Sequence, residues 1–331
     1  MAEQNPARVM DLVFGFIPTQ IVRTMATLDL ADRLAEGPAS PEELAKLTDC
    51  DEPSLRRLLR GAAFVGLLAL NDDGTYELTP DGHLLRADVP GSVKQLAVYL
   101  TGEPTWSACG SLAHTVRTGQ PAVSGYDWLA EDPAAQVEFY ESCAGVARQD
   151  VPELVEALDL SGVRDLVDLG GGTGMLMAGL LAANPGLRGV VFDQQAALTP
   201  AVLEAAGVAD RCTLTAGDFL ADPLPPGCDA YVLKNVLCDW GDNDVVRILR
   251  ACGEAMRADS VLFVIDLVLP EDNAAPAPVA LMSDLCTLAC GGAVRTEREF
   301  GDLAAAGGLR VAEISETRTG TGTNILRVVK G

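Results

Sequence analysis

Residues 165–174 read Asp-Leu-Val-Asp-Leu-Gly-Gly-Gly-Thr-Gly, a short apolar strand pattern that runs directly into a glycine-rich turn. Glycine lets the backbone adopt left-handed conformations and approach a ligand closely. The apolar stretch after Gly174 predicts a helix whose N-terminus faces the same ligand. The spacing is GxGxG rather than GxGxxG, because Met175 and Met177 stand where the longer motif needs glycine. The stretch therefore predicts a nucleotide site, but it disfavours nicotinamide cofactors.

Strand and helix patterns alternate from residue 164 onward. Short apolar strands separated by amphipathic helices, such as the one expected over 244–256, are typical of a mostly parallel sheet covered on both faces. The sequence therefore predicts a doubly wound α/β domain whose ligands bind outside the carboxyl ends of the strands. The expected strands are residues 165–170, 189–193, 212–217, 230–234, 260–266, 310–317 and 325–329.

Polar side chains follow three successive strands of this expected sheet. The glycine turn follows the first strand, Asp193 ends the second, and Asp218 with Phe219 ends the third. A carboxylate at 193 can accept hydrogen bonds from two ribose hydroxyls. Asp218 can accept from an adenine amino group, and Phe219 can stack on the ring. Each aspartate alone is more often a turn or cap residue, but together they indicate a nucleoside-binding edge.

The first 150 residues are expected to be mostly helical, with periodicity over about residues 6–36. Ser40 and Glu43 form a capping box at the start of a second helical stretch. A helix over 52–65 and a hairpin over 67–78 complete a winged-helix pattern. Such a pattern serves either DNA binding or packing and dimerisation.

Charge decides between these two interpretations. Lys plus Arg total 24 and Asp plus Glu total 47, so the formal net charge is −23. This acidity opposes binding to nucleic acid and to an anionic membrane surface. We therefore expect the winged helix to serve packing or dimerisation, with DNA binding as the weaker alternative.

Cysteine and histidine usage indicates neither a metal site nor a disulfide framework. The nine cysteines form no CxxC pair, and His83 and His114 are the only histidines. The N-terminus lacks a secretory signal pattern, and no run of eighteen apolar residues predicts a membrane span. A cytoplasmic location is expected.

Five stretches together resemble one family. DLVDLGGGTG, GVVFD, AGDFL, LKNVLCDWGD and GGAVRTEREF resemble the S-adenosylmethionine (SAM)-dependent small-molecule O-methyltransferases, which include plant caffeate-type and bacterial polyketide-type enzymes. The resemblance implies a Rossmann-like class I methyltransferase sheet, SAM as cofactor, a small aromatic or polyketide-like acceptor and a homodimer. It implies a winged-helix dimerisation domain over residues 1–90, a helical capping region over 91–150 and a SAM-binding domain over 151–331.

The resemblance also implies which residues bind cofactor and acceptor. The acceptor pocket is expected at the segment around residues 281–288. Trp106 is expected in the core or the dimer interface, with stacking on the acceptor as the alternative. The expected cofactor-binding residues are Gly170, Gly172, Asp193, Asp218, Phe219, Lys234 and Arg148, and the expected acceptor-wall residues are Met282, Cys286, Thr287 and Trp106.

The catalytic positions depart from the family pattern. Cys238 stands where the family has its catalytic histidine, Asp266 replaces one supporting acid, and Val294 replaces the other. The candidate catalytic residues are Asp266 and Cys238. An unperturbed thiol is a poor base near neutral pH, so Asp266 is the better candidate base, with a strand-end residue that orients the site as the alternative. Cys238 is expected as a small wall residue, with a thiolate base or thiol hydrogen-bond donor as the alternative. Methyl transfer depends strongly on proximity. The alternatives are transfer to carbon or nitrogen, or a SAM-binding relative that performs hydroxylation, decarboxylation or cyclisation.

Overall fold

The computed structural model describes residues 5–103, 105–122, 133–271, 278–318 and 322–331. Its internal contacts divide the chain into two compact units, residues 1–103 and 104–331. The expected three-part division at residues 90 and 150 therefore stays a prediction.

The N-terminal unit is helical where helical periodicity was expected, over residues 6–36, and this stretch is divided into three helices. The chain breaks around Gly15 and again at Asp29, whose φ of +54° is left-handed and cannot continue a helix. These breaks were invisible to periodicity, because the apolar spacing continues across them. The helices of the unit are α1 (Pro6–Val13), α2 (Phe16–Thr27), α3 (Leu30–Leu34), α4 (Pro41–Thr48), α5 (Glu52–Phe64), α6 (Pro80–His83) and α7 (Lys94–Thr101).

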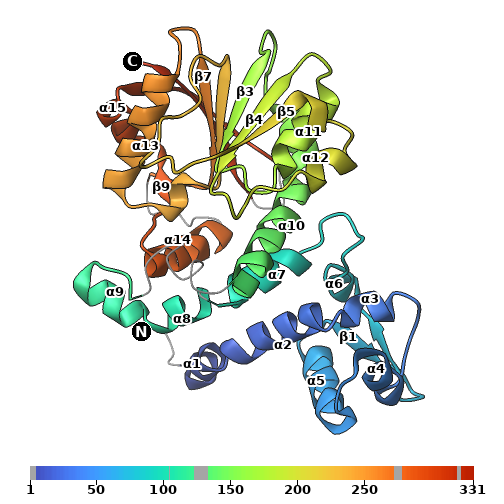
Figure 1. The fold of residues 1–331 in the computed structure, drawn as a ribbon. Coiled ribbons are helices and arrows are strands. Elements are labelled where there is room, and N and C mark those ends of the chain that lie inside the picture. The colour runs from blue at the N-terminus through green and yellow to red at the C-terminus, as the bar shows by residue number, and fades with distance from the viewer. Residues whose placement is uncertain (1–4, 104, 123–132, 272–277, 319–321) are drawn as a thin grey trace. The chain divides into compact units, whose positions relative to one another are not determined.

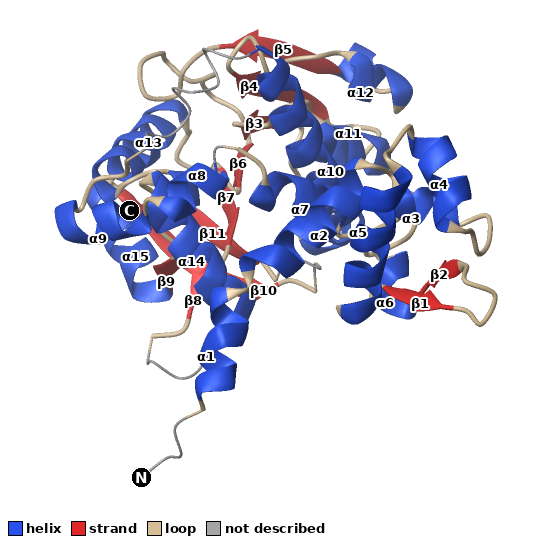
Figure 2. Cartoon of the chain, turned by 90° about the horizontal axis from the view of Figure 1, so that it is seen from below, coloured by secondary structure: helices blue, strands red, loops and turns tan. Residues whose placement is uncertain are grey.

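The predicted capping box is confirmed at the start of α4. Ser40 Oγ accepts from Glu43 N at 3.3 Å, and Glu43 Oε2 accepts from Ser40 N at 2.8 Å. The predicted hairpin is present as β1 (Leu68–Leu70) and β2 (Tyr76–Leu78), which lie beside α6 in Figure 2. A small core fills the unit between these elements, with Met25, Leu30, Leu44, Leu59 and Tyr76 among its members.

Helix α1 and the start of α2 expose apolar side chains. No residue of α1 is buried. Within the described residues, Pro6–Thr27 is long and apolar enough to cross a membrane by length and composition alone, which is weak evidence. The exposed apolar residues are Val9, Met10, Leu12, Val13, Phe14, Phe16 and Ile17.

The C-terminal unit is built around a seven-stranded sheet with the order β10-β11-β7-β6-β3-β4-β5. Strands β5, β4, β3, β6 and β7 are parallel, and β11 and β10 each pair antiparallel to their neighbour. All seven expected strands are present, and their ends lie within one residue of the prediction. They are β3 (Asp165–Leu169), β4 (Arg188–Asp193), β5 (Cys212–Ala216), β6 (Ala230–Lys234), β7 (Val261–Asp266), β10 (Leu309–Glu316) and β11 (Asn324–Lys330).

Helices cover both faces of this sheet (Figure 1). On one face α13 (Asp242–Ala255) and α15 (Glu297–Ala306) pack over a core that includes Val245, Ile248 and Phe300. On the other face lie α10 (Pro133–Ala157), α11 (Met175–Ala183) and α12 (Ala201–Ala205), over a core that includes Leu154 and Leu180. The remaining elements are α8 (Thr105–Gly110), α9 (Leu112–Thr118), η2 (Ala209–Arg211), η3 (Leu237–Asp239), β8 (Val268–Leu269), α14 (Pro278–Cys290) and β9 (Arg295–Thr296).

Strand β3 lies at the point where the strand order reverses. From β3 the chain proceeds outward through β4 and β5, and then returns to place β6 on the other side of β3. In such sheets the connections after the central strands diverge and leave a crevice at the carboxyl edge. The topology therefore brings the ends of β3, β4, β5, β6 and β7 to one edge.

Candidate cofactor and acceptor site

The turn after β3 adopts left-handed conformations at three glycines. The φ angle is +70° at Gly170, +56° at Gly172 and +80° at Gly174. Residues with a Cβ reach such values at a cost of roughly 1–2 kcal/mol each. A Cβ at Gly170 would lie 2.8 Å from Val236 Cγ2, whereas nothing lies within 4 Å of a Cβ at Gly172. The turn therefore packs against the end of β6 and leaves open space above Gly172.

Asp193, at the end of β4, holds this turn in place. Its Oδ2 accepts from Gly172 N at 2.7 Å, and its Oδ1 accepts from Gln194 N at 2.7 Å. Burial raises the pKa of this carboxyl, and the two N–H donors oppose that shift. Each carboxylate oxygen keeps a second lone pair, so Asp193 can still accept hydrogen bonds from a ligand's hydroxyls.

Asp168, within β3, is a site residue that sequence reasoning missed. Its side chain is 2% exposed, and Oδ2 is one of the few buried polar atoms of the described residues without a hydrogen-bond partner. A Cβ at Gly171 would lie 2.7 Å from this oxygen, so the carboxyl lies directly beneath the turn. Burial and the Asp193 carboxylate raise the pKa of Asp168 to about 7, against the lowering effect of Lys234. Its one sequence signal is an aspartate inside an apolar strand.

Lys234, at the end of β6, is engaged by a residue of α10. Its Nζ lies 2.9 Å from Asp150 Oδ2, and their side chains are 8% and 0% exposed. Arg148 is exposed. Because Arg148 and Asp150 lie about 200° apart around the helix axis, Arg148 faces away from Lys234. The structure thus places Lys234 at the carboxyl edge of the sheet, at the end of β6, but does not bring Arg148 beside it.

Asp218 and Phe219 follow β5 at the same edge. Asp218 is exposed, and its Oδ1 accepts from Leu220 N at 2.8 Å, which is the ordinary role of an aspartate in a turn. Phe219 packs edge-to-face on Trp240, with ring centroids 5.6 Å apart and an interplanar angle of 82°. A Cβ at Gly170 would lie 3.7 Å from Phe219 Cε1. Phe219 therefore stands beside the glycine turn, as a wall for an adenine ring requires.

Cys238 and Asp266 meet at the ends of β6 and β7. Asp266 is 1% exposed; its Oδ2 accepts from Cys238 N at 3.1 Å and its Oδ1 from Leu267 N at 2.9 Å. Burial raises the pKa of Asp266 to about 6, so the carboxyl is mostly ionised at neutral pH. Burial and the carboxylates of Asp266 and Asp239 raise the pKa of the Cys238 thiol well above its usual value. Cys238 is therefore a neutral thiol and no base.

Helix α14 carries the expected acceptor-wall residues and packs against η3. Met282 is exposed, and Cys286 and Thr287 are half-buried. Helix α8, which carries the half-exposed Trp106, packs on α14. The Cys109 thiol of α8 lies beside that of Cys286 and contributes, after burial, to raising the pKa of Cys286 to about 12. The expected acceptor residues therefore come together on one helix pair, next to the Cys238 turn.

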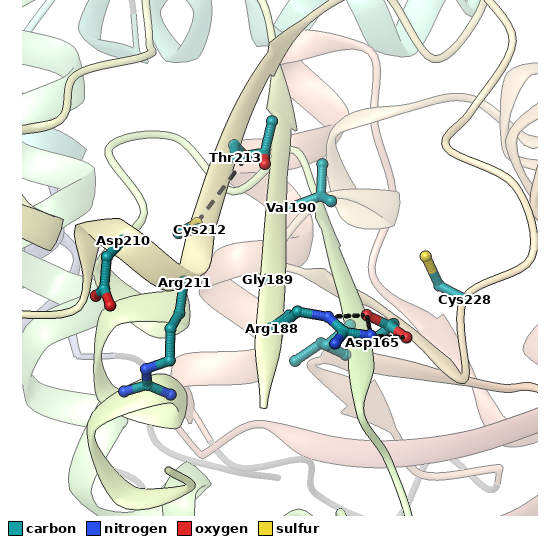
Figure 3. Close-up of a pocket in the computed structure, with 10 residues that line it drawn as sticks. Asp165, Arg188, Gly189, Val190, Asp210, Arg211, Cys212, Thr213 and Cys228 are labelled. Atoms are coloured by element: carbon teal, nitrogen blue, oxygen red, sulfur yellow. Dashed lines mark hydrogen bonds and ion pairs between the residues drawn. The ribbon is translucent and has the colours of Figure 1, made fainter. Parts of the chain in front are cut away.

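Figure 3 shows a cavity at the opposite edge of the sheet, where β3, β4 and β5 begin. The Arg188 guanidinium is paired with Asp165, with Nη2 at 2.9 Å from Oδ2. Arg211 donates to the carbonyls of Leu181, Asn184 and Leu187 at 2.7–3.0 Å and so caps the end of α11. Both cations of this cavity are thus bound within the protein, and we assign it no cofactor.

Two family models match the chain. One, described as an O-methyltransferase domain, matches residues 111–310, and another, described as an O-methyltransferase dimerisation domain, matches residues 10–88. The chain belongs to the O-methyltransferase family. As a member of this family it is a SAM-dependent methyltransferase, and its fold is the class I methyltransferase fold that the sequence predicted.

Three relatives illustrate the range of this family. Mitomycin biosynthesis 6-O-methyltransferase of Streptomyces lavendulae is 37% identical over 313 residues, covering 92% of this chain and 88% of that protein. The O-methyltransferase NcsB1 from neocarzinostatin biosynthesis, solved with SAM and 2-hydroxy-5-methyl naphthoic acid, is 31% identical with a TM-score of 0.81 and 100% coverage of both chains. Aclacinomycin 10-hydroxylase RdmB of Streptomyces purpurascens is 33% identical over 332 residues, covering 93% of this chain and 85% of that protein.

The residues of this methyltransferase fit SAM on physical grounds. The glycine turn leaves open space above Gly172, and Asp193 offers acceptors there. The buried Asp168 oxygen without a partner requires a hydrogen-bond donor, and the ammonium of SAM can donate one. A ligand with an ammonium at this anionic edge fits the buried carboxyl, so Asp168 joins Gly172 and Asp193 as a candidate cofactor residue.

Asp168 leads to a prediction about pH. In the folded protein without cofactor, Asp168 keeps its proton up to about pH 7, whereas the unfolded chain releases it near pH 4. Its contribution to stability is therefore lost as pH rises from about 4 to 7, and is constant above. A cationic cofactor requires the ionised form of Asp168. The affinity of the enzyme for this cofactor therefore rises with pH as the Asp168 carboxyl ionises near pH 7. Calorimetry with S-adenosylhomocysteine (SAH), whose ammonium remains, should show about tenfold tighter binding at pH 8 than at pH 6.

Asp168→Asn tests the assignment because it removes the titration but conserves shape. This variant should bind SAH more weakly at pH 8 and lose most of the pH dependence. Asp165→Asn, at the start of the same strand and paired with Arg188, is the matched control and should retain it. A full pH dependence in the Asp168 variant would assign the titration to another carboxyl.

Proposed function

We propose that this enzyme transfers the methyl group of SAM to a hydroxyl oxygen of a small aromatic or polyketide-like metabolite. One observation carries the proposal: Asp168, Asp193 and the glycine turn form one anionic cradle, and the Cys238 turn adjoins it through Phe219 and Trp240. The named activities of its relatives, which methylate or bind ring compounds, support the acceptor class.

The residues of the chain position the acceptor and provide one group that accepts a proton. Bound SAM contributes an electrophilic methyl group on a sulfonium. The walls of α14 and the Cys238 turn hold the acceptor oxygen and exclude water, and such positioning accounts for much of the rate. We assign proton removal to Asp266, whose pKa of about 6 leaves it ionised at neutral pH and whose oxygens each keep a lone pair. A base of this kind contributes roughly 10²–10⁴-fold.

Methyl-labelled SAM tests the reaction. The enzyme is incubated with labelled SAM and a panel of hydroxylated naphthoates, quinones and anthracycline-type aglycones. Label in an O-methylated product supports the proposal. The relative named as a hydroxylase favours one second candidate, in which SAM is bound but not consumed. In that case molecular oxygen and a two-electron reductant are supplied in the assay; the product carries one new oxygen atom and no label, and SAM is recovered intact. Failure of SAH to bind would overturn both.

We propose that the N-terminal unit is a winged-helix dimerisation domain and that the enzyme is a homodimer. The match of residues 10–88 to a dimerisation domain and the exposed apolar residues of α1 and α2 support this.

The partners and the location of the enzyme follow from its charge and its cysteines. The net charge of −23 disfavours nucleic acid and anionic membranes as partners. All nine cysteines are free, which supports a reducing cytoplasm.

Charge placed on this apolar surface should separate the subunits. Val13 and Phe16 are 57% and 50% exposed. The double variant Val13→Glu/Phe16→Glu is expected to sediment as a monomer at concentrations where the parent is a dimer, because buried unpaired carboxylates are costly. Leu47→Glu, at an apolar residue of α4 that is 57% exposed, is the control and should stay dimeric. A dimeric double variant would place the interface elsewhere.

A further inference from the structure

Arg295 is a fully buried cation that the proposed chemistry does not use. It begins β9, immediately before α15, and its side chain is 2% exposed. Thr296, the next residue, caps α15: its Oγ1 accepts from Glu299 N at 3.3 Å, and Glu299 Oε2 accepts from Thr296 N at 2.9 Å. The backbone at Arg295 is therefore fixed by a helix start. Burying a guanidinium is costly unless its donors are satisfied.

The donors of Arg295 bind mainly to one turn and to the residues beside it, including a bond from Nη1 to Ala293 O at 3.2 Å. Nη1 donates to Leu237 O at 2.9 Å, and Nη2 donates to Trp240 O at 2.7 Å. Nε and Nη2 also bond Asp242 Oδ1, at 3.1 and 2.8 Å. Arg295 thus binds both ends of the turn formed by residues 237–240. Asp242 is the first residue of α13, the helix that follows this turn.

The turn of residues 237–240 lies between the two walls of the proposed site, one for the cofactor and one for the acceptor. At one end Trp240 packs edge-to-face on Phe219, the expected adenine wall. In the middle Cys238 stands at the proposed acceptor side, where its N–H donates to Asp266 Oδ2. Its carbonyl also accepts from Ala293 N at 2.9 Å, which ties the turn to the same segment that carries Arg295. The turn itself is short, and its capping residue Val236 makes no side-chain bond to it.

We propose that Arg295 is a positioning residue for methyl transfer: its guanidinium fixes the turn of residues 237–240, and with it the spacing between the cofactor wall and the acceptor wall. This inference rests on the proposed function. It assigns no contact with substrate or cofactor to Arg295, which acts through Cys238 and Trp240.

The geometry requires an arginine rather than any cation. The two carbonyl bonds start from different nitrogens of a planar fork, whereas a lysine ammonium is a compact group on a flexible stem. Lysine would keep the charge beside Asp242, but it would not hold both ends of the turn in one plane. Arg295→Lys therefore separates the charge of the residue from its shape.

The test compares three variants of the full chain. Arg295→Lys is expected to lower kcat, counted per SAH-binding site, by at least tenfold and to weaken SAH binding at least fivefold. Asp242→Asn leaves both carbonyl bonds in place and should change each value less than threefold. Arg298→Lys, at a 73% exposed arginine of the same segment that pairs with Glu271, should match the parent. Calorimetry counts the SAH-binding sites, and kcat is divided by that number. A variant that merely folded less well would therefore show an unchanged kcat per site.

Each outcome bears on one claim. If Arg295→Lys keeps kcat per site and SAH affinity within twofold of the parent, the inference fails and the proposed function stands. If Asp242→Asn lowers kcat per site and SAH affinity as much as Arg295→Lys does, the ion pair with Asp242 is responsible and the hydrogen bonds to the two carbonyls are not. That outcome also overturns the inference. SAH affinity is measurable even if the parent transfers no label, so failure of the turn to affect the cofactor wall can be told apart from failure of the proposed reaction. A parent that binds no SAH overturns the proposed function itself.

Discussion

Replacing Asp193 by alanine is expected to weaken SAM and SAH binding by about 100-fold or more, with loss of methyl transfer at ordinary SAM concentrations. The carboxylate holds Gly172 N at 2.7 Å and is proposed to accept from the ribose, so the variant loses the turn's anchor and the ligand's partner together. Two hydrogen bonds to a charged group contribute about 1.5–3 kcal/mol each, which corresponds to 10²-fold or more in affinity. Calorimetric titration with SAH measures the loss.

The same variant should stay folded, and this separates a binding effect from a folding effect. Burial raises the pKa of Asp193, which means that its charge is unfavourable in the folded protein without cofactor. Thermal unfolding without ligand should therefore change little. Asp210→Ala, at an exposed aspartate before β5 on the opposite edge of the sheet, should bind SAH like the parent. Unchanged SAH affinity in the Asp193 variant would move the ribose site to another strand end.

Replacing Gly292 by alanine is expected to lower the melting temperature of the C-terminal unit by roughly 6–12 °C. A Cβ at this position would overlap the Cys238 carbonyl oxygen and lie 3.0 Å from Asp239 Cα, so the backbone of the 237–240 turn must move. Overpacking of this kind costs about 3 kcal/mol, and each kcal/mol shifts the melting temperature of a unit of this size by about 2–4 °C. Differential scanning calorimetry gives the shift, and methyl transfer should fall at least tenfold.

Gly301 provides the matched control for Gly292. It lies within α15, and nothing lies within 4 Å of a Cβ built there. Alanine is the better helix former by about 1 kcal/mol, so Gly301→Ala should raise the melting temperature slightly and leave methyl transfer unchanged. A Gly292 variant as stable and active as the Gly301 variant would show that the segment adjusts without displacing Cys238.

Local pattern was sufficient for much of the fold. The expected strand over 230–234 is the observed β6, and the capping box at Ser40 is present as predicted. Both depend on short-range rules, namely apolar runs bounded by turn residues and a cap three residues from its partner. The helical periodicity expected over 6–36 is present as three helices, and the breaks between them depend on backbone conformation at Gly15 and Asp29 and not on apolar spacing.

The sequence by itself determined the doubly wound sheet and the glycine turn with Asp193, because strand ends and glycine spacing are local properties that the parallel topology carries to one edge. Only the tertiary structure decided what surrounds them. It placed the Asp168 carboxyl, one oxygen of which has no hydrogen-bond partner, beneath the turn, and it paired Lys234 with Asp150. It also brought the guanidinium of Arg295 into hydrogen bonds with both ends of the Cys238 turn. These are pairings between residues 55 to 84 positions apart in the chain, or effects of burial on charge. Distance and burial are properties of the folded chain, and no local spacing encodes them.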